Sequence, residues 1–211
     1  MRVAAKICGL STPETLDAAI GGGASHVGFV FFPQSPRHLT FDKAAGLAAR
    51  VPARVGRVGV FVDPDDALLA AAIDSGRLDA IQLHTVSRDR ASAIAVRYRL
   101  PMWIAVAVRT RADLDQAQGW QGLAERILYD AKTPQGALPG GMGLRFDWKL
   151  LDGFAHPAPW ALSGGLSPDN VAEAVGITGA RMVDVSSGVE SAPGVKDVDK
   201  IARFLQAVAR L

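Results

Sequence analysis

The sequence predicts an α/β protein whose parallel strands close into a single (β/α)8 barrel. Short apolar runs alternate with helix-like segments along all 211 residues. The runs are nearly continuous in apolar residues, which is typical of strands covered on both faces. Eight such runs give roughly 26 residues per unit, a spacing that suits an eightfold barrel. An open, doubly wound sheet is the alternative fold.

The eight expected strands are rich in β-branched and aliphatic residues. They are residues 3–8, 26–31, 57–62, 79–84, 103–108, 126–131, 160–164 and 182–186. No linker or change of composition divides the chain, so we expect one barrel domain over residues 1–211.

Helix signals lie between these strands, and we expect about eight helices in a barrel of this kind. Several segments begin with a residue that can cap a helix N-terminus, followed in two of them by proline. These candidate caps are Ser11 or Thr12, Thr40 and Ser167. The last segment places Val198, Ile201, Leu205 and Val208 on one helical face, which predicts a helix packed on the barrel.

The composition limits the partners of the chain. The formal net charge is +2, and the two signs are interleaved without the basic stripe of a nucleic-acid-binding surface. This balance does not repel a phosphorylated metabolite. No apolar run reaches the roughly 18 residues that indicate a membrane helix. We expect a monomer, since no long exposed apolar helix demands a partner.

The one cysteine and the absence of an export signal indicate the cytoplasm. We expect neither a metal nor an organic cofactor. The four histidines lack metal-ligand spacing, and neither a P-loop nor a dinucleotide fingerprint occurs.

Functional residues of such a barrel lie at the carboxyl ends of the strands. Cys8 ends the first expected strand, although a lone cysteine can also be a small buried apolar residue. Asp130 ends the sixth, about half-way round the barrel, although it can also be a helix cap or a solvated acid. Two groups facing each other across the barrel mouth can act as an acid–base pair. Gly9 is expected to leave space for substrate.

The two chemical roles would require particular protonation states. An aspartic acid donates a proton at pH 7 only if burial raises its pKa from about 3.9 to about 7. A cysteine, with an ordinary pKa near 8.5, needs a modest downward shift or a proton transfer after substrate binds.

Two further side chains at strand ends are candidates for contact with a substrate. Arg37 follows the second strand and is either a solvated loop residue or the holder of a carboxylate through its planar fork. Gln82 and His84 end the fourth strand and are interpreted as core or rim groups, with His84 at the edge of the substrate site.

Two glycine-containing loops follow the last two strands, where many such barrels hold a phosphate. Glycine lets backbone N–H groups approach an anion closely, although each loop alone could be a tight turn. The candidate residues are Gly164, Gly165, Ser186, Ser187 and Gly188. By contrast, residues 21–23 lie at the other end of the barrel and predict a helix cap, whereas residues 140–143 indicate a mobile lid.

The sequence resembles the phosphoribosylanthranilate isomerases of tryptophan biosynthesis. The resemblance rests on "KICGL", "GFVFFPQSPRHL", "QLH", "YDAK", "SGGLSPDNV" and "DVSSGVE", in this order over nearly the whole chain. It implies a barrel without a cofactor that carries out an Amadori rearrangement. The sequence departs from the family at Met142, Leu144 and Thr85, which affects details of the lid and a loop.

The resemblance also implies roles for individual residues. Cys8 matches the general base, Asp130 the general acid and Arg37 the group that meets the anthranilate carboxylate. Asp184 matches an acid that helps to position the substrate. The loops at Gly164-Gly165 and Ser186-Ser187-Gly188 match the phosphate cradle.

Three alternatives can be compared with the sequence, and the features that distinguish the first two are not seen in it. The related isomerase of histidine biosynthesis would have aspartate in place of Cys8 and a second phosphate loop. Indole-glycerol-phosphate synthase would have a catalytic lysine and glutamate and an N-terminal extension. A non-catalytic phosphosugar-binding barrel would tolerate replacement of Cys8 and Asp130.

Overall fold

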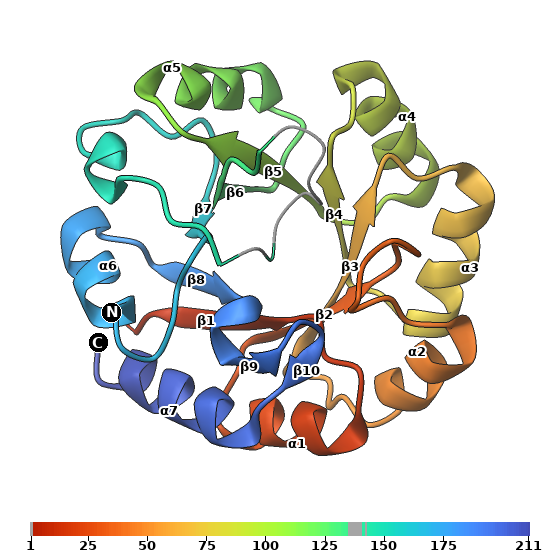
Figure 1. Cartoon of the computed structure of the whole chain (residues 1–211). Coiled ribbons are helices and arrows are strands. Elements are labelled where there is room, and N and C mark those ends of the chain that lie inside the picture. The colour runs from red at the N-terminus through yellow and green to blue at the C-terminus, as the bar shows by residue number, and fades with distance from the viewer. Residues whose placement is uncertain (1, 135–140, 142) are drawn as a thin grey trace.

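The eight strands close into a barrel in sequence order, with helices around the outside (Figure 1). The computed structural model describes residues 2–134, 141 and 143–211. The strands are β1 (Ala4–Cys8), β2 (His26–Val30), β3 (Gly56–Val62), β4 (Ala80–His84), β5 (Met102–Val108), β6 (Arg126–Ala131), β7 (Trp160–Leu162) and β8 (Met182–Val185). Because β8 pairs in parallel with β1, the barrel prediction is confirmed and the open sheet is wrong.

Seven α-helices and three 3-10 helices lie in the described part of the chain. They are α1 (Pro13–Gly21), α2 (Phe41–Ala48), α3 (Asp66–Gly76), α4 (Arg88–Tyr98), α5 (Arg111–Leu114), α6 (Val171–Thr178) and α7 (Val198–Ala209), with η1 (Asp115–Trp120), η2 (Trp148–Leu151) and η3 (Ser187–Val189). These numbers agree with the expectation of about eight helices. Between β6 and β7 the described residues form the short η2, and α5 is a single turn that continues into η1.

Two of the predicted helix caps, both near the start of the chain, are confirmed. Thr12 and Thr40 cap α1 and α2, and each hydroxyl accepts a hydrogen bond from a backbone N–H three residues later. In α7, Ile201, Leu205 and Val208 are buried against the barrel, as their spacing predicts.

The cap expected at Ser167 is wrong. Helix α6 begins at Val171 with Asn170 as its N-cap. The Asn170 amide accepts a hydrogen bond from the Ser167 N–H at 2.8 Å and donates one to the Gly165 carbonyl at 2.9 Å. These bonds fold residues 165–170 into a turn, so the loop after β7 extends further than the proline signal suggests.

The barrel interior is layered. Its lower layer is apolar, with Val58, Ala80, Trp103, Leu128, Ala161 and Met182 packed together. Successive residues of a strand point to opposite faces, so the residue two positions later lies above each of these on the same face. On four strands that next position is polar: Gln82, Asp130, Ser163 and Asp184. The fold thus places a polar layer directly above an apolar floor, at the carboxyl ends of the strands.

A hairpin that the strand pattern did not predict follows the barrel. Strands β9 (Glu190–Ala192) and β10 (Val195–Lys196) pair antiparallel after η3. Figure 1 shows this hairpin at the barrel mouth, beside the end of β1. It brings two charged side chains, Glu190 and Lys196, to the site and buries both.

Candidate active site

The predicted acid, base and arginine meet in one cavity at the barrel mouth. The cavity opens to solvent and contains about 610 Å³ of space not filled by protein atoms, and its lining includes Cys8, Arg37, His84, Asp130, Asp184 and Ser186. A second open cavity, with about 330 Å³ of such space, adjoins it and is lined by Gly164, Gly165, Ser186 and Ser187 among others. Asp130, Asp184 and Ser186 line both cavities, so the two form one continuous site.

Asp130 ends β6 at the boundary of the two cavities. The pKa of its carboxyl is raised to about 7, mainly by removal from water and in addition by the nearby Asp184 carboxylate. The Ala131 N–H donates a hydrogen bond to Oδ1 at 2.8 Å, and this bond acts to lower the pKa of the carboxyl. This carboxyl can therefore hold a proton near neutral pH, which is the state that a general acid needs.

Cys8 ends β1 and is 7 % exposed, packed with Val30 and Val60 at the top of the barrel interior. Burial raises the pKa of its thiol above the ordinary value, whereas the Lys6 ammonium acts to lower it. Of the two routes to a thiolate that the sequence left open, a downward shift of the pKa does not occur in the free protein, and proton transfer after substrate binds is the route that is left. The thiol is protonated at neutral pH because burial outweighs the nearby cation.

A buried ion pair lies below these two groups. Lys6 is fully buried, and its Nζ donates to Asp184 Oδ1 at 2.8 Å. Asp184 Oδ2 accepts a hydrogen bond from Ser163 Oγ at 3.3 Å. Asp184 is thus held by protein groups on both of its oxygens, which restricts its freedom to contact a substrate directly.

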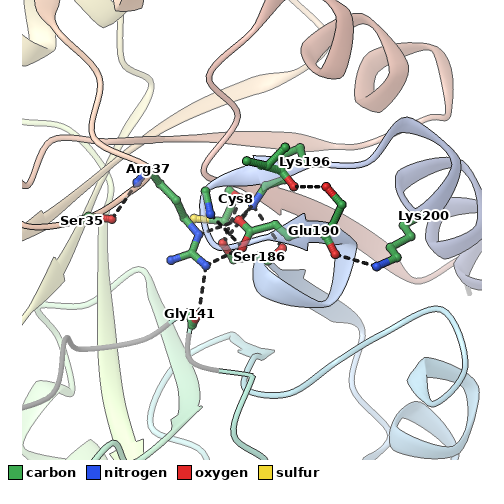
Figure 2. Close-up of polar contacts among 11 residues, drawn as sticks. Cys8, Ser35, Arg37, Gly141, Ser186, Glu190, Lys196 and Lys200 are labelled. Atoms are coloured by element: carbon green, nitrogen blue, oxygen red, sulfur yellow. Dashed lines mark hydrogen bonds and ion pairs between the residues drawn. The ribbon is translucent and has the colours of Figure 1, made fainter.

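Arg37 reaches into the cavity but is already engaged (Figure 2). Its Nε and Nη2 donate to the two oxygens of Glu190, both at 2.7 Å, and Nη2 also donates to the Gly141 carbonyl at 3.0 Å. Lys196 Nζ donates to the same Glu190 carboxylate at 2.5 Å. The guanidinium group of Arg37, which the sequence suggested as the holder of a substrate carboxylate, therefore already binds Glu190 along one edge.

The Glu190 network also reaches the loop after β8. Lys196 Nζ donates to the Ser186 carbonyl at 3.1 Å, and Ser186 Oγ donates to the Cys8 carbonyl at 3.2 Å. Figure 2 shows Cys8 beside this group of residues. The hairpin thus connects the arginine, the loop after β8 and the end of β1.

Gly9 does not provide the space that was expected for the substrate. Its φ is +78°, and a Cβ atom there would lie 2.6 Å from Arg37 Cδ. The absent side chain therefore makes room for Arg37, which crosses over the end of β1.

The two glycine-containing loops lie side by side at the second cavity. Gly164 and Gly165 have φ values of +83° and +66°, a backbone region that favours glycine. A Cβ atom at Gly164 would lie 2.6 Å from the Ala131 nitrogen, and one at Gly188 would overlap the Leu166 carbonyl. Both loops therefore need glycine to pack closely against their neighbours.

His84 lies at the rim of the larger cavity, and its Nε2 is 3.1 Å from the Gln82 amide nitrogen. Burial lowers the pKa of His84 to about 4, so this imidazole is neutral at pH 7. The lid predicted at residues 140–143 falls largely outside the described residues. Of that segment, Gly141 contacts Arg37.

Sequence reasoning missed Lys6, Ser163, Glu190 and Lys196. A lysine inside the apolar run "VAAKIC" was a usable signal, because a cation in a buried strand requires a partner. Glu190 ends the motif "DVSSGVE", but neither its pairing with Arg37 nor that of Lys196 can be read from local sequence.

No three His, Cys, Asp or Glu residues are grouped to hold a metal ion in the part of the chain that the structure describes. Among the same residues, no helix is long and apolar enough to cross a membrane.

Comparison with known proteins decides the family. Residues 5–207 match the family model described as N-(5'-phosphoribosyl)anthranilate isomerase. The chain belongs to this family. The resemblance stated from the motifs is thereby confirmed, and the chain is an enzyme of the isomerase class.

Several relatives in the family match the chain along its whole length. The N-(5'-phosphoribosyl)anthranilate isomerase of Zymomonas mobilis subsp. pomaceae is 54% identical over 213 residues and covers 100% of both chains. That of Paramagnetospirillum magneticum is 52% identical and covers 98% of this chain and 97% of its own.

Solved structures of the family share the fold. The phosphoribosyl anthranilate isomerase of Thermotoga maritima aligns with a TM-score of 0.88 at 35% identity, covering 99% of this chain and 100% of its own. Another structure of such an isomerase, in complex with reduced 1-(o-carboxyphenylamino)-1-deoxyribulose 5-phosphate, aligns with a TM-score of 0.84 at 34% identity, with the same coverage.

Proposed function

We propose that the chain converts N-(5-phosphoribosyl)anthranilate into 1-(2-carboxyphenylamino)-1-deoxyribulose 5-phosphate, an Amadori rearrangement in tryptophan biosynthesis. The observation that carries this proposal is that Cys8 and Asp130 line one cavity between Arg37 and the two glycine-containing loops. The substrate has a carboxylate at one end and a phosphate at the other. The site offers a cation near one end and backbone N–H groups near the other.

Asp130 is the proposed general acid. Its proton goes to the ring oxygen of the ribose as the bond between C1′ and that oxygen breaks. The nitrogen lone pair forms the C1′–N double bond at the same time, which leaves a protonated imine and the Asp130 carboxylate. A pKa of about 7 suits this role, since proton donors work best when their pKa is near the working pH.

Cys8 is the proposed general base. Its thiolate removes the C2′ proton, and the electrons of that C–H bond form an enolamine, which tautomerises to the ketose. The thiol is protonated in the free protein, so the reactive thiolate forms as a minor species or after substrate binds. The positive charge of the protonated imine favours removal of the adjacent proton.

Arg37 is the proposed contact for the anthranilate carboxylate. Glu190 occupies the edge formed by Nε and Nη2, and the Nη1 group is the side of the fork not engaged by Glu190. We infer that the substrate carboxylate approaches the end formed by Nη1 and Nη2, where it competes with the Gly141 carbonyl for Nη2. His84 lines the same cavity.

The loops at Gly164-Gly165 and Ser186-Ser187-Gly188 are the proposed phosphate cradle. Gly164, Gly165, Ser186 and Ser187 line the smaller cavity, whereas Gly188 does not. The positive φ values of Gly164 and Gly165 allow an anion to come close to the chain there. Asp184 forms an ion pair with Lys6 at the base of the cavity, and this pair is proposed to orient the groups above it.

Turnover by purified protein tests this proposal. We expect the fluorescence of phosphoribosylanthranilate to disappear with the wild-type protein. We expect Cys8→Ser and Asp130→Asn each to lose at least about 100-fold in kcat, the range for a general acid or base, with an unchanged circular dichroism spectrum. A folded wild type without turnover would contradict the assigned reaction, and full kcat in either variant would remove the role of that residue.

A further inference from the structure

The Lys6–Asp184 ion pair lies between the two proposed proton-transfer groups on the barrel wall. From β6 to β1, neighbouring strands carry in turn Asp130, Ser163, Asp184 and Lys6, with Cys8 two residues beyond Lys6. The negative member is therefore nearer in the ring to Asp130, and the positive member is on the strand of Cys8.

The geometry of this ion pair is fixed by the sheet. The register pairs Lys6 directly with Asp184 across β1 and β8. Lys6 is 0 % exposed and donates to Asp184 Oδ1 at 2.8 Å, while Ser163 holds the other oxygen. Because protein groups hold the ammonium and both carboxylate oxygens, the direction of the pair relative to Cys8 and Asp130 is fixed.

The Lys6 side chain runs alongside the Cys8 thiol. Both converge on Gly28 of β2, where a Cβ atom would lie 2.9 Å from Cys8 Sγ and 3.2 Å from Lys6 Cε. Gly28 leaves this space open, so the ammonium end of Lys6 and the sulfur share one small volume. The same cation acts to lower the pKa of the Cys8 thiol, and Asp184 acts to raise the pKa of Asp130. Each charge also has a smaller opposite effect, since Lys6 acts to lower the pKa of Asp130 and Asp184 to raise that of Cys8.

A gain in folding stability does not explain why the buried Lys6–Asp184 ion pair occurs at this position. Taking two charges out of water costs several kcal/mol per ion, and well-packed apolar residues often replace a buried pair without loss of stability. The layer just below is apolar and would accept such residues. A fully buried lysine beside a nucleophilic thiol therefore points to a role in the chemistry.

We propose that Lys6 is a positioning residue that stabilises the Cys8 thiolate. The Lys6–Asp184 pair is oriented so that the Lys6 ammonium favours the thiolate of Cys8, and the Asp184 carboxylate favours the protonated form of Asp130. This inference rests on the proposed roles of Cys8 and Asp130. It explains how two groups in one cavity can be driven toward opposite protonation states.

Other charged groups also face Cys8 and must be included. Lys196 on β10 acts in the same direction as Lys6, and Asp184 on β8 opposes both. The remaining ionisable groups that line the same cavity are Arg37, His84 and Asp130. Of the two lysines, Lys6 has the larger effect on the thiol, while Lys196 is bound to Glu190.

The rate of alkylation by iodoacetamide, measured against pH, tests this inference. Cys8 is the one cysteine of the chain, so the midpoint of the rate curve reports the pKa of this thiol alone. We expect Lys6→Met to raise the midpoint by about one pH unit or more, a tenfold loss of thiolate at a given pH. We expect Asp184→Asn to lower it, because the opposing charge is gone.

Two further variants make the result decisive. Lys132→Met breaks another lysine–aspartate pair, to Asp113 at 2.9 Å, and should leave the midpoint unchanged. The double variant Lys6→Met/Asp184→Asn leaves no buried charge unpaired and covers the case in which a single variant does not fold. Its midpoint should lie above that of Asp184→Asn, because only the double variant lacks the cation.

The inference is overturned if Lys6→Met leaves the midpoint unchanged, or if Lys6→Met and Asp184→Asn move it in the same direction. A double variant with the midpoint of Asp184→Asn would overturn it as well. Alkylation requires no turnover, so failure here is distinguishable from failure of the proposed reaction, which the activity of Cys8→Ser tests separately.

Discussion

Asp130 illustrates at the scale of one residue how function opposes stability. Its pKa is about 7 in the folded protein, whereas an aspartate in an unfolded chain ionises near pH 3.9. The unfolded chain therefore gains free energy by ionising at pH values where the folded site cannot. A carboxyl group that is useful as an acid at neutral pH thus reduces the stability of the fold there.

Because the raised pKa of Asp130 reduces stability at neutral pH, Asp130→Asn should increase the free energy of unfolding by an amount that depends on pH. The raised pKa means that the contribution of Asp130 is fully present below about pH 4 and is lost as pH rises towards 7. Asparagine does not ionise, so the variant should gain up to about 4 kcal/mol in the free energy of unfolding relative to wild type between pH 4 and pH 8. Urea denaturation at the two pH values measures this difference. A stability difference independent of pH would show that the Asp130 pKa is ordinary.

Cys8 shows what a single residue in a sequence can and cannot reveal. Its place at a strand end could be derived from the spacing of apolar runs. Its raised pKa could not, because that depends on Val30 and Val60 packing around it and on Lys6 beneath it. The sequence left open whether the pKa is lowered or whether the proton moves after substrate binds, because burial is not visible in the local sequence.

At the scale of elements, the β9–β10 hairpin supports the site from outside the barrel. Glu190 binds Arg37 through both oxygens and Lys196 through one of them. Proline and glycine at 193–194 were a turn signal in the sequence, but two very short strands gave no periodicity to confirm it. The hairpin was missed for this reason, and the partner of Arg37 was missed with it.

Glu190→Gln should weaken both substrate binding and the fold. The variant leaves Lys196 buried without its carboxylate, which costs about 3–5 kcal/mol when a buried pair is broken. It also frees Arg37 to leave its position, so we expect KM to rise about tenfold or more. Steady-state kinetics and urea denaturation measure the two effects.

A double variant separates the two effects of Glu190. Glu190→Gln/Lys196→Met removes one of the two buried cations that lose their carboxylate and should recover part of the stability, while KM stays high because Arg37 still lacks its partner. Recovery of both stability and KM would contradict a positioning role for Glu190.

The loop after β7 depends on glycine. Gly164 has a φ of +83°, and an added Cβ atom would lie 2.6 Å from the Ala131 nitrogen and 2.9 Å from Asp130 Oδ1. We expect Gly164→Ala to lower the melting temperature and to reduce the rise in melting temperature that inorganic phosphate gives the wild type. Gly176→Ala in α6 is the matched control, since nothing lies within 4 Å of its Cβ position and alanine favours the helix. Equal behaviour of the two variants would exclude a special role for Gly164.

At the scale of the whole molecule, the alternation of strands and helices was sufficient to predict the closed barrel. Boundaries were less accurate, because the signal at Ser167 marks a turn held by Asn170 and not a helix start. The residues at the strand ends were found because the barrel rule specifies where to look. Their roles came from the family resemblance.

The contacts within the site could not be predicted, because they join distant parts of the chain. Lys6 and Asp184 are 178 residues apart, and Arg37 and Glu190 are 153 apart. Both pairs exist because closure of the barrel brings β8 and its hairpin back to β1 and β2. Sequence patterns describe local elements, whereas these ion pairs depend on closure.

The central claim is that Asp130 protonates the ring oxygen and Cys8 removes the C2′ proton. The most direct test is kcat on substrate carrying deuterium at C2′, compared with ordinary substrate, in Cys8→Ser and Asp130→Asn. We predict a large isotope effect in Cys8→Ser, because C–H cleavage limits its rate, and a ratio near unity in Asp130→Asn, because ring opening limits the rate there. The same isotope effect in both variants, or the reverse order, would contradict the assigned roles.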